Sequence, residues 1–141
     1  MVSLSPSFVR LALAALCGAA VGLERDLHRR PAGLRTSMFV CMGSALFTIL
    51  SDEISRAFGD PSGTRIVSNL IPGIGFLGAG AIIRERGGVT GLTTAATIFV
   101  LAGVGMAIGA GLYAIGLFSV ALILFGLIVL AWVERRLDIK G

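Results

Sequence analysis

A densely charged block separates two nearly uncharged apolar stretches near the start of the chain, and this contrast constrains the fold more than any other feature. Residues 22–36 read GLERDLHRRPAGLRT and contain four arginines, one histidine and two carboxylates. Lys and Arg accumulate in the loops that face the cytoplasmic side of a membrane. An apolar segment that ends in such a block and then resumes is therefore typical of a chain that crosses a membrane and returns.

The composition excludes an ordinary soluble domain. The chain is 55% hydrophobic and 14% charged, whereas a soluble domain carries about 25% charged residues. Its net charge of +4 does not indicate a nucleic-acid partner, because the basic residues lie in short loops between apolar segments. Cys17 and Cys41 lie in the middle of apolar segments, so we interpret them as buried apolar side chains. The partner that surrounds the chain is the lipid bilayer.

Five apolar segments are long enough to be considered as membrane spans. Their approximate ranges are 8–23, 36–50, 66–83, 92–109 and 112–133. A helix needs about 17–25 residues to cross the hydrocarbon core, so the first two segments must be extended by their flanking residues. We predict an all-α membrane protein with five transmembrane helices in a single transmembrane domain, residues 1–141.

The distribution of basic residues predicts the orientation. Nine of the twelve Lys and Arg residues lie in the first loop, in the turn at 84–86 and in the C-terminal tail. The other side keeps only Arg10, Arg56 and Arg65. Because positive charge marks the cytoplasmic loops, we predict that the N-terminus lies outside and the C-terminus lies in the cytoplasm.

Glycine is concentrated in the third segment, which contains PGIGFLGAG at positions 72–80. Three of these glycines match the dinucleotide-binding pattern G-x-G-x-x-G, but that pattern requires a soluble strand–helix unit, so we reject it. Two interpretations stay open: a packing helix with a face of small residues, or a helix broken at Pro72 whose freed carbonyls line a polar site. The residues concerned are Asn69, Pro72, Gly73, Gly75, Gly78 and Gly80, with Gly105 and Gly109 of the fourth segment.

Polar residues at the ends of several segments fall on the predicted cytoplasmic side, where we expect them to form a functional cluster. They are Glu24, Arg25, Arg35, Thr36, Arg84, Glu85, Thr93 and Thr94. A carboxylate near lipid is normally paired, so we expect Glu24 to pair with Arg35 or Arg84. The threonine hydroxyls can instead bond to carbonyls of their own helix. Arg29, by contrast, is expected to face lipid headgroups.

The three motifs together resemble the MgtC/SapB family of bacterial inner-membrane proteins. The matching blocks lie at 22–36, 65–85 and 90–97, and the likeness covers most of residues 8–110. The resemblance implies a multi-pass protein of the bacterial inner membrane with five spans and a cytoplasmic basic loop. It also implies a link to growth at low magnesium and, in pathogens, to virulence through survival inside host cells. Some members are reported to act on the membrane sector of ATP synthase.

The chain departs from the family pattern in two places. Longer members carry a soluble C-terminal domain, whereas this chain stops at Gly141, so we expect a short form that lacks that domain. Pro72 stands where a small polar residue is more usual, which keeps the broken-helix interpretation open.

Two kinds of function remain open, and an enzyme is not expected. The first is a protein that regulates or binds other membrane proteins, with a homo-oligomer, most simply a homodimer, as a further expectation. The second is a transporter or channel-like protein for Mg²⁺ or a related solute. No acidic residue lies in the middle of a segment, so Mg²⁺ lacks a clear ligand set and we expect no cofactor. His28 lies in a loop and is interpreted as a solvated residue, and no nucleophile–base pair is recognisable.

Overall fold

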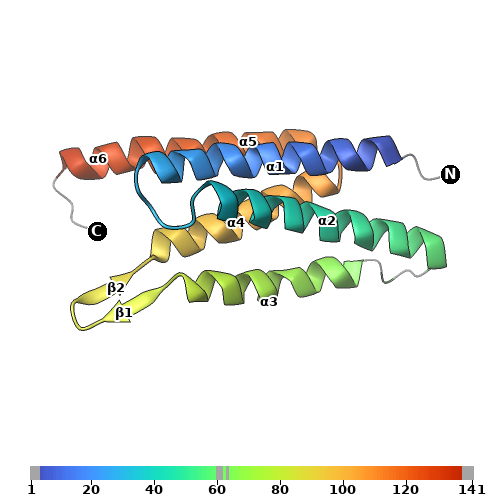
Figure 1. Cartoon of the computed structure of the whole chain (residues 1–141), viewed down its shortest axis with the longest axis horizontal. Helices are drawn as coiled ribbons and strands as arrows, with labels where there is room; N and C mark the ends of the chain where they lie inside the picture. Colours follow the sequence, from blue (N-terminus) through green and yellow to red (C-terminus); the bar gives the residue numbers. More distant parts are fainter. Residues whose placement is uncertain (1–3, 60–61, 63, 138–141) are drawn as a thin grey trace.

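Long helices run side by side and alternate in direction, as the computed structural model shows for residues 4–59, 62 and 64–137 (Figure 1). The first four are α1 (Leu4–Leu27), α2 (Leu34–Phe58), α3 (Thr64–Gly80) and α4 (Leu92–Gly109). The last is continuous from α5 (Tyr113–Phe125) through a short π-helical stretch, η1 (Gly126–Leu130), into α6 (Ala131–Arg136). Lys140 of the predicted cytoplasmic tail lies outside the described residues.

Four of these helices are long and apolar enough to cross a membrane. They cover Pro6–Leu27, Leu34–Phe58, Leu92–Gly109 and Tyr113–Arg136. Helix α3 has 17 residues, which is the lower limit of what a span needs. The structure is therefore that of a multi-pass membrane protein, and the number of five spans stays a prediction. Helices α1 and α2 extend beyond the expected 8–23 and 36–50, because their polar ends continue the helix.

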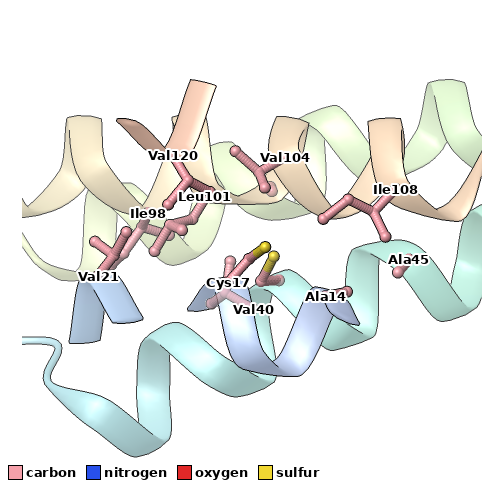
Figure 2. Close-up of a cluster of buried hydrophobic side chains, with 12 residues drawn as sticks. Ala14, Cys17, Val21, Val40, Ala45, Ile98, Leu101, Val104, Ile108 and Val120 are labelled. Carbon is pink, nitrogen blue, oxygen red and sulfur yellow. The ribbon is translucent and has the colours of Figure 1, made fainter. Parts of the chain in front are cut away.

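Helices α1, α2 and α4 form the tightly packed part of the bundle. Their buried apolar side chains form the cluster of Figure 2, where Ala14 and Cys17 of α1 face Val40 of α2 and Leu101 of α4. Helix α2 also buries the hydroxyl side chains of Ser37, Ser44, Thr48 and Ser51. Helix α5 adds Val120 to this cluster. Cys17 and Cys41 are both buried and free.

Glycines allow the close approach of these three helices. A methyl group at Gly22 of α1 would lie 2.6 Å from the Cα atom of Leu34 in α2. A methyl group at Gly109 of α4 would lie 2.7 Å from the carbonyl oxygen of Ala45, and Gly18 and Gly105 are equally confined. The neighbours are mostly backbone atoms, which cannot move aside as a flexible side chain can. These glycines pack inside the bundle, as small residues do in membrane proteins.

Helix α3 lies at the side of this core, against α2 and α4. It runs without interruption through Pro72 and ends at Gly80, so the structure does not show the helix broken at the proline. Gly78 is the residue of α3 that is buried, and it faces Ala95 of α4. Asn69 is exposed, and Gly73, Gly75 and Gly80 border open space.

A short β-hairpin connects α3 to α4 and was not expected from an all-α prediction. Strands β1 (Ile83–Glu85) and β2 (Gly88–Thr90) pair antiparallel, with Glu85 opposite Gly88. Its strands contain β-branched residues, which favour extended structure, and glycines allow the tight two-residue turn. Gly91, the residue that precedes α4, has a left-handed φ of 87°. A Cβ atom at this position would collide with the carbonyl oxygen of Ala81.

Candidate functional site

The candidate site lies at one end of the bundle, where the loop between α1 and α2, the hairpin and the end of α6 come together on the same side (Figure 1). The α1–α2 loop has a defined conformation. Arg29 and Ala32 both adopt positive φ values, 53° and 56°. The Asp26 carboxylate accepts a hydrogen bond from the backbone N–H of Leu34 at 2.9 Å, which fixes the start of α2.

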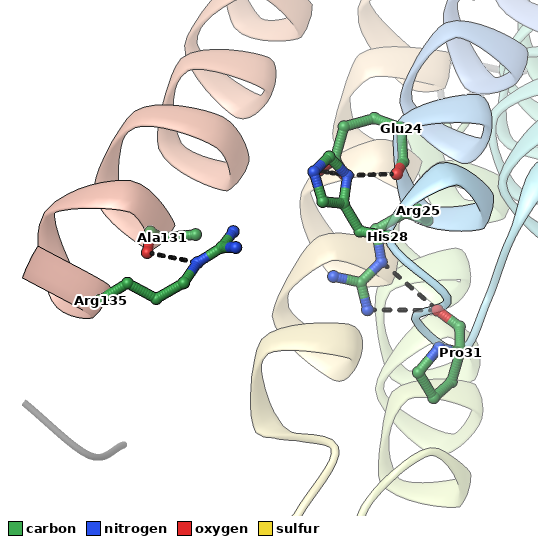
Figure 3. A network of polar contacts seen from close by, with 6 residues as sticks. All are labelled: Glu24, Arg25, His28, Pro31, Ala131 and Arg135. Carbon is green, nitrogen blue, oxygen red and sulfur yellow. Dashed lines mark hydrogen bonds and ion pairs between the residues drawn. The ribbon is translucent and has the colours of Figure 1, made fainter.

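Arg25 is the centre of the site. Its side chain is buried, with 3% of the residue exposed. Its Nη2 atom donates to Thr94 Oγ1 at 2.6 Å, and Nε and Nη2 donate to the Pro31 carbonyl oxygen at 3.3 and 3.2 Å (Figure 3). One guanidinium therefore joins the end of α1, the loop and the first turn of α4. Its planar set of five donors suits this role, because several acceptors can be bonded at once.

Glu24 lies beside Arg25 and is also buried, with 9% of the residue exposed. Its Oε1 atom lies 3.0 Å from His28 Nδ1, which is also 3.0 Å from the Glu24 carbonyl oxygen. This contact replaces the expected pairing with Arg35 or Arg84, because residues four apart on a helix are neighbours. His28 is thus a half-exposed partner of Glu24 rather than a wholly solvated residue. Glu24 Oε2 is buried and has no hydrogen-bond partner.

The other predicted residues surround this centre without joining it. Arg35, Thr36, Arg84, Glu85 and Thr93 are all exposed. Among the described residues, the side chains of the two arginines and of the glutamate make no hydrogen bond or ion pair. The Thr93 carbonyl oxygen accepts a hydrogen bond from Thr97 at 2.8 Å, as its position in a helix implies. The structure therefore brings together three of the eight predicted residues: Glu24, Arg25 and Thr94.

Several residues of the site were not identified from the sequence. Pro31 contributes through its carbonyl oxygen, and buried Ser37 donates to the Ala32 carbonyl oxygen at 3.0 Å. Backbone acceptors carry no sequence signal, so these contacts could not be found in advance. At the other end of the bundle, Arg10 donates to the Gly109 carbonyl oxygen at 3.0 Å and to Tyr113 Oη at 3.2 Å. Arg10 is the one charge within an apolar segment, which could have marked it.

The arrangement does not resemble a metal centre. In the part of the chain that the structure describes, no three His, Cys, Asp or Glu side chains converge. Arg135 of α6 bonds to the Ala131 carbonyl oxygen of its own helix at 3.3 Å (Figure 3). The chemistry of the site is that of a buried arginine holding three segments together beside a carboxylate with one free oxygen.

Comparison with known proteins identifies the family. Residues 11–136 match the MgtC family, which is most of the chain. The chain belongs to the MgtC family. No solved structure matches it.

Individual members of the MgtC family are similar over much of this chain. It is 40% identical over 140 residues to the Escherichia coli protein named "Putative magnesium transporter YhiD", covering 94% of this chain and 64% of that protein. It is 39% identical to SapB of Bacillus subtilis, with 92% and 58% covered. It is 48% identical over 102 residues to MgtC of Brucella abortus, with 72% and 42% covered. The chain thus spans less than two thirds of the length of these relatives.

Proposed function

We propose that this MgtC-family protein serves magnesium homeostasis and adaptation to low magnesium by binding other membrane proteins, rather than by carrying ions. Membership of the family and the magnesium-related name of YhiD support the link to Mg²⁺. We place the protein in the bacterial inner membrane, with five spans, the N-terminus outside and the C-terminus in the cytoplasm. It has no enzymatic activity in this proposal.

The observation that carries the proposal is the open face of α3. Gly73, Gly75 and Gly80 have no neighbouring atom where a side chain would begin, and Phe76 is 84% exposed. In lipid, small residues promote association because they allow a second helix to come close. The exposed glycines of α3, which have no partner inside the chain, are therefore suited to contact with a helix of another protein. The ATP synthase membrane sector and a second copy, giving a homodimer, are the candidate partners.

The alternative is a transporter or channel-like protein for Mg²⁺ or a related small solute. The printed name of YhiD favours it, and so does the free oxygen of buried Glu24. Mg²⁺ keeps several waters and binds to carboxylates, yet no carboxylate lies in the middle of any of the four helices that are long and apolar enough to span a membrane. The interior between α1, α2 and α4 is also closely packed around an apolar cluster. We therefore prefer the binding function.

Transport by the purified protein in sealed vesicles separates the two functions. The vesicles would contain a Mg²⁺-sensitive dye and would be compared with empty vesicles and with vesicles that hold a known magnesium channel. Binding without transport predicts no flux above the empty vesicles. Flux that depends on the protein and falls in the Glu24→Gln variant would favour the transporter instead.

Reporter fusions test the proposed orientation. Alkaline phosphatase, which is active only outside the cytoplasm, should be active when fused after Ser62 and inactive when fused after Arg30. A third fusion after Gly87 decides whether α3 crosses the membrane, because the hairpin returns to the cytoplasmic side only if it does. Activity after Gly87 together with activity after Ser62 would reduce the number of spans to four.

A further inference from the structure

A groove runs along the outer surface of the bundle between α2 and α3. Its volume is about 390 Å³. From α2 it is lined by Thr36, Phe39, Val40, Gly43, Ser44 and Phe47, and from α3 by Leu70, Ile74 and Leu77. All but two of these residues are apolar, and one of the two, Thr36, lies near the end of α2 that adjoins the candidate site.

The dimensions of the groove decide what can occupy it. From Thr36 to Phe47, α2 rises by about 16 Å at 1.5 Å per residue, which is about half the 30 Å hydrocarbon core. The groove therefore has the length of a hydrocarbon chain from one leaflet.

Positive charge gathers at the end of the groove that would meet the headgroups. Arg35 is adjacent to Thr36 on α2, and Arg84 and Arg86 follow α3 in the hairpin. All three are exposed, and no ion pair holds any of them among the described residues. Along β1, side chains alternate between the two faces, so Arg84 and Glu85 point to opposite sides. Free arginines at a membrane surface attract anionic headgroups.

We propose that this groove is a binding site for an anionic phospholipid of the leaflet on the hairpin side. One acyl chain lies between Phe39, Phe47 and Leu70, and Arg35 and Arg84 bind the phosphate. The site requires only that the chain spans a membrane, so it does not depend on the proposed binding of other proteins. It would make the headgroup composition of that leaflet a determinant of how α3 is held against α2.

Gly43 provides a direct test, because a Cβ atom at this position meets no protein atom within 4 Å and a larger side chain would extend into the groove. The matched control is Gly103, a glycine of α4 that also borders open space but does not line the groove. The full chain would be purified in mild detergent, given equal amounts of phosphatidylglycerol and phosphatidylethanolamine, and examined by native mass spectrometry. We expect the wild type and Gly103→Leu to retain one phosphatidylglycerol at least fivefold more often than one phosphatidylethanolamine. We expect Gly43→Leu to lose the bound phosphatidylglycerol.

Two outcomes would overturn the proposal. Equal retention of phosphatidylglycerol by Gly43→Leu and Gly103→Leu would show that the lipid binds elsewhere. Dissociation of a dimer in Gly43→Leu alone would show that the groove is occupied by a second copy of the chain.

A fluorescence measurement keeps the test decisive if Gly43→Leu does not fold. The single tryptophan would be removed as Trp132→Phe, and a new one would be placed in the groove as Phe47→Trp or on the open face of α3 as Phe76→Trp. A small fraction of brominated phosphatidylglycerol should quench the groove reporter several-fold more than brominated phosphatidylcholine does. The Phe76→Trp reporter should show no such preference.

The headgroup contact is tested in the same assay. Arg35→Gln should reduce the preference for phosphatidylglycerol at the groove reporter several-fold. Arg65→Gln, at the opposite end of α3, should leave that preference unchanged. Equal quenching of both reporters by the two brominated lipids would mean that the groove contacts only bulk lipid, and the proposal would fail.

Discussion

The same residue type has opposite roles in two parts of this bundle. In the core of α1, α2 and α4, Gly18, Gly22, Gly105 and Gly109 lie where any side chain would meet the backbone of a neighbouring helix. On α3, Gly73, Gly75 and Gly80 meet nothing. At the first group the packing within the chain leaves no room for a side chain, whereas the second group leaves room for a partner outside the chain. Glycine spacing alone therefore does not distinguish a contact inside the chain from one with a partner outside it.

The substitution with the largest expected effect is Gly105→Leu. Its side chain would collide with the Cys41 carbonyl oxygen and with Ser44 of α2, so α2 and α4 would have to separate. Overpacking usually costs about 1–3 kcal/mol, and backbone neighbours place this case at or above the upper limit. Gly103→Leu, two residues away on the same helix, is the matched control.

The pair would be compared by thermal unfolding in detergent. Gly105→Leu should not yield folded protein or should melt far below the wild type. Gly103→Leu should stay within about 0.5 kcal/mol of the wild type, as is usual for a surface position. Equal stability of the two variants would remove the distinction between core and open glycines.

Arg25→Ala should have the next largest effect. It removes the hydrogen bonds that Arg25 donates to Thr94 and to the Pro31 carbonyl oxygen. A hydrogen bond that involves a charged group contributes about 1.5–3 kcal/mol. Arg29→Ala is the control, since its side chain is exposed, and it should show no measurable loss of stability. If Arg29→Ala destabilised the protein as much, Arg25 would not be the organising residue of this end.

His28→Ala should have a smaller effect on stability than Gly105→Leu or Arg25→Ala. The His28 side chain is 46% exposed, and a contact of this kind contributes about 1 kcal/mol or less. The change in melting temperature should therefore be small compared with that of Arg25→Ala in the same detergent. A loss as large as that of Arg25→Ala would make the Glu24–His28 pair, rather than Arg25, the main tie at this end.

The sequence predicts the helical part of the fold well, because long apolar segments and arginine-rich loops are strong signals in a membrane protein. It also identifies Arg25 and Thr94 as members of one site, although they are far apart along the chain. The expected pairing of Glu24 with Arg35 or Arg84 was wrong, because His28, four residues after Glu24 along the chain, lies close enough to pair with it instead. The hairpin was missed because a three-residue strand carries little periodicity.

The exposed position of α3 could not be predicted from the sequence either. Gly75 and Ala79 have the same spacing as Gly105 and Gly109, and periodicity gives the face of a helix but not its neighbour. Pro72 suggested a break, yet α3 continues through it. The choice between these interpretations depends on which helices flank α3, and the packing of the whole bundle determines those neighbours.

We propose that the exposed glycines of α3 serve contacts outside the chain and are not needed inside it. Gly75→Leu tests it most directly when stability and function are measured on the same variant, with Gly103→Leu as the control. We expect Gly75→Leu to melt like the wild type in detergent but no longer to restore growth at low magnesium to a strain that lacks its own copy. Normal growth with Gly75→Leu, or a loss of stability comparable to that of Gly105→Leu, would contradict it.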